Sequence, residues 1–422
     1  MKAISQLSLR TLAGHRRVQQ AGFLYLSKLL GVAFAFVTSV IYTRTLGPNS
    51  YGDLKFINVL FEFLATISTL GLFITAGQMI AQIPHDDDRR SEFVGSVVFS
   101  AGIISSVLVV ITIAFCAIES RMFNNGLARV IAIFSPIIPV IIFDACLSSL
   151  LQGDNRIHEL ASSTLMRGLL MVIALTVVHM VAPLNLLLTL AIQLATGLVV
   201  SAVLVARLHP RMSNLILSAR QLWATNRKFG SHVYVGILCG VATGYISTFT
   251  ISYFLDNARV GFYSLAMALA NPLVEIPAVA ATTYFKDFST RAELPTKVTV
   301  LTLVISLVAL TAFLLIIKPL VLLVYTDKFA KVASLARILA VGSVLEGFGT
   351  YINRFLMAHG RGKELRNVAI AVGCVNVAGF SILVKLLGVE GAAITYVLSR
   401  ATYLFLFILY YRKFCAGGLS AI

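Results

Sequence analysis

The sequence predicts an all-helical integral membrane protein, and three observations carry that prediction. Of the 422 residues, 58% are hydrophobic and only 12% are charged, whereas soluble domains contain about 25% charged residues. Long apolar runs such as 99–118 and 298–317 approach the roughly 20 residues that a helix needs to cross a bilayer. These runs lack the short alternating pattern of barrel strands, so we expect the membrane spans to be helices.

Glycines, prolines and charge clusters divide the chain into twelve expected spans. The first span follows a basic leader and is longer than the apolar core of a signal peptide, so we expect it to be retained. The spans are 21–45, 51–83, 92–118, 127–151, 157–180, 183–206, 229–255, 260–285, 295–317, 332–357, 365–387 and 391–411.

The two halves of the chain repeat each other weakly. Gly52, after the first span, has a counterpart in Gly261, after the seventh, at an offset of 209 residues. Gly153 and Gly360 match in the same way at an offset of 207. Because each half contains six spans, both halves insert with the same orientation, and we expect a pseudo-two-fold axis along the membrane normal.

Lysine and arginine in the loops set the expected orientation. Most of them lie on the side of the N-terminus, which predicts that both termini are cytoplasmic. The longest connection between spans is basic and lies between the halves, so we expect a linker at the cytoplasmic surface. The expected organisation is a basic N-terminal segment (1–20), an N-terminal lobe (21–206), a basic linker (207–228) and a C-terminal lobe (229–422).

Polar side chains inside the spans are candidates for function, because a charge at a helix centre costs about 2.5 to 3.5 kcal/mol on insertion scales. The second span carries Lys55, Asn58 and Glu62 on one helical face; a polar seam sealed by neighbouring helices is the alternative interpretation. The eighth span carries Asn271 and Glu275 near two prolines, which predicts a broken helix. A simple kink, with Glu275 neutralised by an arginine, is the alternative there.

Further candidates lie inside other spans or at their ends. Arg337 and Arg400 are more typical of structural ion pairs. The acidic stretch HDDDRR at 85–90 is more typical of a solvated loop than of a metal site. With no nucleophile triad, phosphate-binding glycine loop or spaced metal ligands, we expect no enzyme activity, no cofactor and no metal. The remaining candidates are Lys28, Arg44, Asp144, Arg167 and Glu346.

Four motifs resemble those of the polysaccharide-biosynthesis flippases, which move lipid-linked oligosaccharides. These flippases form part of the wider superfamily of multidrug and oligosaccharidyl-lipid exporters. The resemblance covers nearly the whole chain, and the joint order of the motifs is more specific than any one of them. In chain order they are TRTLGPNSYGDL, LLQGDNR, NARVGFYSLAMAL and LLGVEGAAITYVLSR.

The resemblance implies two six-helix lobes around a cavity that opens alternately to either side of a bacterial inner membrane. It implies an undecaprenyl-pyrophosphate substrate that carries a sugar repeat unit, such as an O-antigen unit. The implied partners are this glycan, membrane lipids and the polysaccharide polymerase machinery, with no nucleic acid. Twelve expected spans, against fourteen in the peptidoglycan-precursor branch, make a lipid II substrate less expected.

The resemblance also suggests roles for the candidate residues. Lys28, Arg44 and Lys55 fall where the family places positive charge along the cavity. Lys and Arg partners suit a pyrophosphate held away from bulk water. We expect these three residues and Arg167 to contact the pyrophosphate. The expected polar or ion-coupling residues of the cavity are Asn58, Glu62, Asp144, Asn271, Glu275 and Glu346.

Two other functions remain open at the level of sequence. A drug or cation antiporter of the same superfamily should have acidic cavity residues for cationic substrates, whereas the set here is balanced or positive. A membrane polysaccharide polymerase should have a large extramembrane loop for its chemistry, and all the expected connections are short.

Overall fold

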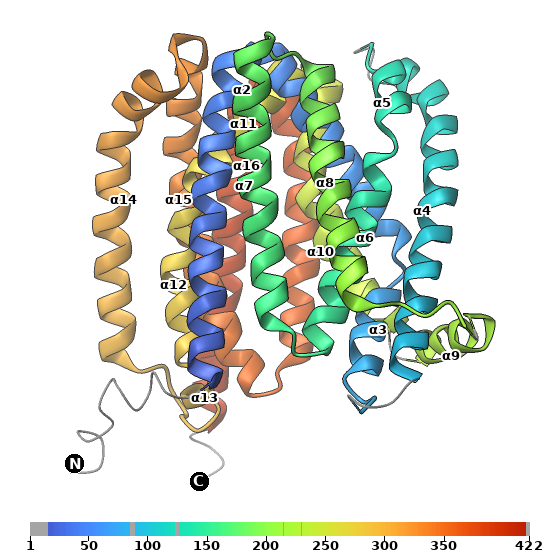
Figure 1. Cartoon of the computed structure of the whole chain (residues 1–422). Helices are drawn as coiled ribbons and strands as arrows, with labels where there is room; N and C mark the ends of the chain where they lie inside the picture. The colour runs from blue at the N-terminus through green and yellow to red at the C-terminus, as the bar shows by residue number, and fades with distance from the viewer. Residues whose placement is uncertain (1–15, 85–88, 123–125, 214, 229, 419–422) are drawn as a thin grey trace. The chain divides into compact units, whose positions relative to one another are not determined.

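The computed structural model describes residues 16–84, 89–122, 126–213, 215–228 and 230–418. All regular structure in these ranges is helical (Figure 1), so the expected fold class is confirmed. The aspartates of HDDDRR and residues 1–15 lie outside the described residues, as does the side chain of Lys28. The helices are α2 (Arg16–Ser68), α3 (Leu72–Ile80), α4 (Arg89–Met122), α5 (Ala128–Phe134), α6 (Ile137–Gly153), α7 (Ile157–Val181), α8 (Leu186–Leu208), α9 (Leu215–Lys228), α10 (Gly230–Phe254), α11 (Asn257–Ala270), α12 (Pro272–Thr283), α13 (Phe285–Phe288), α14 (Thr296–Tyr325), η1 (Asp327–Phe329), α15 (Ala330–Ala358) and α16 (Gly362–Gly418).

The outward faces of several helices are apolar. Val110 on α4 is 67% exposed, Val181 on α7 is 85% exposed and Leu323 on α14 is 78% exposed. Removing a CH₂ group from water is favourable by about 0.8 kcal/mol. Exposure of these faces to lipid is therefore favoured over exposure to water. Together with the long apolar helices, they identify a multi-pass membrane protein.

The number of spans depends on how broken and merged helices are counted. In the described residues, seven helices are long and apolar enough to cross a membrane, or up to nine if each of two bent pairs is one span. Two of the seven, α2 and α16, have 53 and 57 residues and are interrupted at Gly47 and Gly388. Both glycines have a positive φ angle, 71° and 67°. Residues other than glycine rarely adopt this backbone conformation. The expected count of twelve stays a prediction.

Two helix breaks bear on the expected spans. The eighth span is broken as predicted, because α11 and α12 meet at Pro272 with a bend of 40°. The prediction of one continuous span over 51–83 was wrong. This span is interrupted between α2 and α3 at Leu70 and Gly71, whose φ angles are 48° and 75°. A Cβ atom on Gly71 would lie 2.5 Å from the carbonyl oxygen of Gly230, so close packing requires the glycine.

The contacts divide the chain into two compact units. Unit 1 contains the described residues up to Thr45 and Leu60–Ile237, whereas unit 2 contains Leu46–Val59 and the described residues from Leu238 onward. A short part of α2 therefore belongs to unit 2. The lobe boundaries expected from the sequence stay a prediction.

The α2 segment of unit 2 is fixed by buried polar contacts. Tyr51 is fully buried. Asn257 Nδ2 donates to Asp53 Oδ1 at 2.8 Å, and Ser252 Oγ donates to Asn257 Oδ1 at 2.6 Å. Asp256 caps α11 by accepting a hydrogen bond from the Arg259 amide at 2.8 Å. These contacts position the start of α11, which forms one wall of the cavity described below.

Candidate functional site

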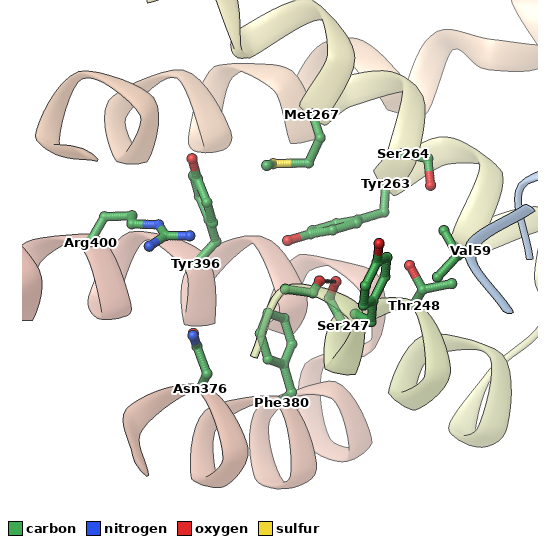
Figure 2. Close-up of a pocket in the computed structure, with 12 residues that line it drawn as sticks. Val59, Ser247, Thr248, Tyr263, Ser264, Met267, Asn376, Phe380, Tyr396 and Arg400 are labelled. Carbon is green, nitrogen blue, oxygen red and sulfur yellow. Dashed lines mark hydrogen bonds between the residues drawn. The ribbon is translucent and has the colours of Figure 1, made fainter. Parts of the chain in front are cut away.

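A cavity of about 320 Å³ lies among the helices of unit 2. Figure 2 shows its lining side chains converging from different helices. The volume lies at the lower end of the roughly 300 to 1,000 Å³ typical of ligand pockets. The lining residues are Val59, Gly244, Tyr245, Ser247, Thr248, Tyr263, Ser264, Met267, Asn376, Phe380, Tyr396 and Arg400.

Helical spacing explains how these side chains come together. On α16, Asn376 and Phe380 are four residues apart, as are Tyr396 and Arg400 beyond the Gly388 break. Residues four apart lie on one face of a helix. The Gly388 break therefore lets a single long helix contribute two faces to the cavity.

The charged group of the cavity is neutralised by a carboxylate behind it. Arg400 Nε lies 3.1 Å from Glu346 Oε2 on α15, and about a quarter of each side chain is exposed. Tyr396 donates a hydrogen bond from its hydroxyl to the same Glu346 oxygen at 2.6 Å. The Arg400 guanidinium also lies 5.0 Å from the centre of the Tyr396 ring. The predicted structural ion pair of Arg400 is thus present, but Arg400 also faces the cavity.

Small residues on α15 allow this arrangement. A Cβ atom on Gly342 would lie 2.6 Å from ring carbons of Tyr396. A larger residue at this position would push the tyrosine ring away from Glu346, one turn further along α15. Gly342 therefore sets the position of one wall of the cavity.

The structure also brings together two candidates from unit 1. Arg167 on α7 donates through Nη2 to Asp144 Oδ1 on α6 at 2.6 Å. The Arg167 side chain is 37% exposed and that of Asp144 is 36% exposed, so neither is sealed in the core. A guanidinium has five N–H donors, and Arg167 therefore keeps donors for a ligand while it holds Asp144.

The polar face predicted on the second span is divided between different environments. The Lys55 ammonium lies 5.4 Å from the centre of the Tyr51 ring, in unit 2. The side-chain oxygen of Asn58 is buried and has no hydrogen-bond partner in the described residues. Glu62 is exposed, and Thr66 lines a second cavity, of about 200 Å³, in unit 1.

The other candidates lie at exposed positions. Arg44 is exposed near the end of the first α2 segment, and Asn271 and Glu275 are exposed at the bend between α11 and α12. Arg337, which we expected in an ion pair, is also exposed on α15 and pairs with no described carboxylate. The binding and coupling roles of all ten candidate residues stay predictions.

Sequence reasoning missed most of the cavity in unit 2. The tyrosines and hydroxyl residues of α10 and α11 were not identified as candidates, and Arg400 was expected to be structural only. The pairs four residues apart on α16 are the signal that could have found it. That signal is weak, because a single sequence does not show which helical faces converge.

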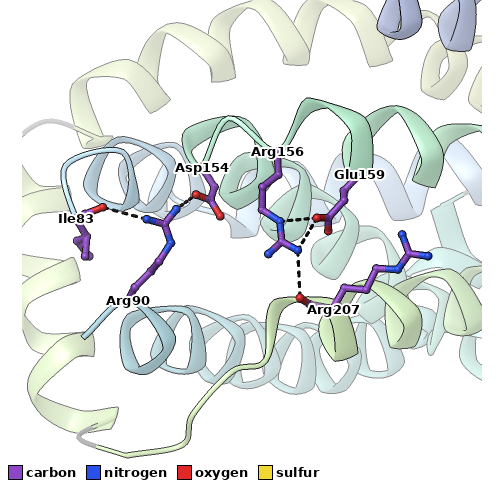
Figure 3. A network of polar contacts seen from close by, with 6 residues as sticks. All are labelled: Ile83, Arg90, Asp154, Arg156, Glu159 and Arg207. Carbon is purple, nitrogen blue, oxygen red and sulfur yellow. Dashed lines mark hydrogen bonds and ion pairs between the residues drawn. The ribbon is translucent and has the colours of Figure 1, made fainter. Parts of the chain in front are cut away.

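A separate ion network joins helix ends in unit 1 (Figure 3). Arg90 on α4 contacts Asp154 at the end of α6 and donates to the Ile83 carbonyl at 3.0 Å. Arg156 Nε donates to Glu159 Oε1 at 2.6 Å, and Arg156 Nη2 donates to the backbone carbonyl of Arg207 at 3.2 Å. The starts of α4 and α7 and the ends of α6 and α8 thus lie together within unit 1.

Comparisons with solved structures establish the fold. The lipid II flippase MurJ, in an inward closed conformation, superposes with a TM-score of 0.71 at 14% identity, over 94% of this chain and 90% of that chain. An inward-facing multidrug resistance transporter of the MATE family superposes with a TM-score of 0.71 at 14% identity, over 92% and 95%. For a MOP superfamily transporter from Pyrococcus furiosus the TM-score is 0.57 at 15% identity, over 94% and 95%. The fold is therefore that of the MOP superfamily.

Sequence comparison identifies the family. None of the curated protein sequences matches this chain. The family model described as polysaccharide biosynthesis protein matches residues 18–285, which is more than half of the chain. The chain therefore belongs to the polysaccharide biosynthesis protein family.

Proposed function

We propose that this protein is a flippase that moves an undecaprenyl-pyrophosphate-linked oligosaccharide, such as an O-antigen unit, across the bacterial inner membrane. Movement occurs by alternating access and is coupled to an ion. The family match over 18–285 supports a role in polysaccharide biosynthesis, and the fold is shared with transporters.

The observation that carries this proposal is the chemistry of the cavity in unit 2. Its lining combines hydroxyl, amide and aromatic side chains. A sugar presents many hydroxyl groups and an apolar ring face, so it needs hydrogen-bonding partners next to aromatic surfaces. Because Glu346 neutralises Arg400, the cavity suits an uncharged glycan better than an ion.

The pyrophosphate requires cations outside this cavity. We assign it to Lys28, Arg44, Lys55 and Arg167. Arg167 is supported best, because its guanidinium is held in place by Asp144 and its side chain is still 37% exposed. A planar guanidinium binds phosphate oxygens in a bidentate manner, which an ammonium does not do.

Ion coupling is assigned to polar groups on α2, α6 and α15 and at the bend between α11 and α12. The carboxylate of Asp144 forms an ion pair with Arg167, and that of Glu346 forms one with Arg400. Protonation would weaken either pair and free the guanidinium. Asn58, Glu62, Asn271 and Glu275 complete the proposed set of polar and coupling residues.

A drug or cation antiporter is the main rival, because the MATE transporter shares the fold. Cationic substrates require uncompensated negative charge. None of the described residues that line the cavity in unit 2 is acidic, and Glu346 behind it is paired with Arg400. The cavity therefore favours the glycan.

The proposal is tested in cells whose only copy of the protein is depleted. We expect lipid-linked oligosaccharide to accumulate at the cytoplasmic face and surface polysaccharide to fall. Wild-type protein should restore export, and a variant with Lys28, Lys55 and Arg167 all replaced by alanine should not. Accumulation of unpolymerised units at the outer face would support a polymerase instead. Full export by the triple variant would exclude the pyrophosphate assignment.

A further inference from the structure

In the sequence, helix α9 connects the two halves of the chain. In the structure it packs within unit 1. Leu222 is fully buried and Asn226 is 3% exposed. Thr75 Oγ1 on α3 donates to Asn226 Oδ1 at 2.8 Å, and Asn226 Nδ2 donates to the Leu70 carbonyl at 3.0 Å. Figure 1 shows α9 beside the ends of α3 and α4. The helix is therefore held at one place by its buried face.

The chain that leads into α9 lies at the level where α4 becomes apolar. The backbone amide of Arg211 donates to the Ser91 carbonyl at 3.0 Å, and Ser213 Oγ donates to Glu92 Oε1 at 2.9 Å. α4 carries its charged side chains up to Glu92 and then runs without charge from 93 to 118. This change from charged to apolar residues marks the boundary of the membrane, so α9 begins at the membrane surface.

The exposed face of α9 has the composition of a lipid-binding surface. Arg220, Trp223, Ala224 and Arg227 are exposed and lie at spacings of three and four residues, hence on one face. The helix contains no Asp or Glu. Tryptophan prefers the interface between acyl chains and headgroups, and Arg or Lys near an anionic membrane surface strengthens binding to it.

We propose that this face of α9, formed by Arg220, Trp223, Ala224 and Arg227, binds the headgroups of anionic phospholipids. The two guanidinium groups contact lipid phosphates, and the indole of Trp223 lies at the boundary of the acyl chains. The anchor through Asn226 transmits this contact to α3, so the lipid holds the end of unit 1 at the membrane surface. This inference does not depend on the transported substrate.

The chain contains a single tryptophan, so tryptophan fluorescence reports on α9 alone. The full-length protein is reconstituted into vesicles of phosphatidylcholine and phosphatidylglycerol in which either lipid is brominated at the same total fraction. We expect brominated phosphatidylglycerol to quench Trp223 at least twofold more strongly than brominated phosphatidylcholine. Equal quenching by the two lipids would overturn the proposal.

Matched variants separate headgroup binding from general charge loss. R220Q/R227Q should abolish the preference for phosphatidylglycerol, and R220K/R227K should keep it. The control R129Q/R337Q removes the same charge from two exposed arginines elsewhere and should also keep it. A preference that survives in R220Q/R227Q would contradict the proposal. If R220Q/R227Q fails to fold, the wild-type protein still tests the proposal. Added salt screens the attraction between arginine and phosphate, so it should reduce the preference for phosphatidylglycerol. A preference that does not change with salt would contradict the proposal.

Discussion

Gly52 and Gly261 pack against each other within unit 2, where a Cβ atom on Gly261 would lie 3.0 Å from the Gly52 Cα atom. The two glycines hold equivalent positions in the halves of the sequence, 209 residues apart. A Cβ atom on Gly52 would lie only 1.8 Å from the Asn257 carbonyl oxygen. Close approach of two backbones therefore explains this glycine of the TRTLGPNSYGDL motif.

Replacement of Gly52 by alanine should destabilise the protein. The new methyl group meets backbone, which yields little, and overpacking of this kind costs about 1 to 3 kcal/mol. Gly102 on α4 is the matched control, because an added Cβ meets nothing within 4 Å. Its replacement by alanine should be neutral or stabilise by about 0.5 to 1 kcal/mol. Thermal unfolding in detergent measures both, and equal melting temperatures would contradict the packing argument.

Removal of one partner of the Glu346–Arg400 pair should cost more than removal of both. R400Q leaves a carboxylate without its cation, and an unsatisfied group of this kind costs about 1 to 3 kcal/mol. In E346Q/R400Q neither charge remains, so part of this loss should be recovered. A double-mutant cycle in thermal unfolding measures the coupling. Additive losses would show that the pair contributes nothing.

Filling the cavity in unit 2 should stop transport without unfolding the protein. Gly244 lines the cavity, and an added Cβ there meets nothing within 4 Å. G244A should flip substrate at nearly the wild-type rate, whereas the ring in G244F should reduce the rate at least tenfold. The two variants should have similar melting temperatures. Wild-type flipping by G244F would exclude this cavity from the substrate path.

A charge swap separates the two roles of Arg167. D144R and R167D should each destabilise unit 1, because each places like charges where a contact of 2.6 Å now exists. The double variant D144R/R167D should recover stability but not export, because it moves the cation from α7 to α6. Surface polysaccharide and thermal unfolding are measured together. Full export by the double variant would show that the pair is only structural.

The sequence predicted the helical class because its apolar runs are long enough to cross a membrane. It also predicted the break near Glu275, because Pro272 removes a backbone donor. It did not predict the break at Leu70 and Gly71. There the sequence from 63 to 83 contains no proline or charged residue, and the positive φ of Gly71 is found where it packs against Gly230, far away in the sequence.

The candidate site was predicted only in part, for the same reason. Asp144 and Arg167 were each expected to matter, but their pairing depends on how α6 and α7 pack. Arg400 was assigned a structural role because its ion pair could be anticipated, whereas the cavity in front of it forms where α10, α11 and α16 converge. Periodicity within one helix does not contain that information.

The most direct measurement uses purified protein in liposomes that contain undecaprenyl-pyrophosphate-linked oligosaccharide in both leaflets. A glycosidase that cannot cross the membrane cleaves only the outer pool when no protein is present. With the wild-type protein we expect the inner pool to become accessible as well, and with G244F we expect it to stay protected. Continued protection of the inner pool by a folded wild-type protein, with exchange of a cationic dye in the same vesicles, would contradict the flippase assignment.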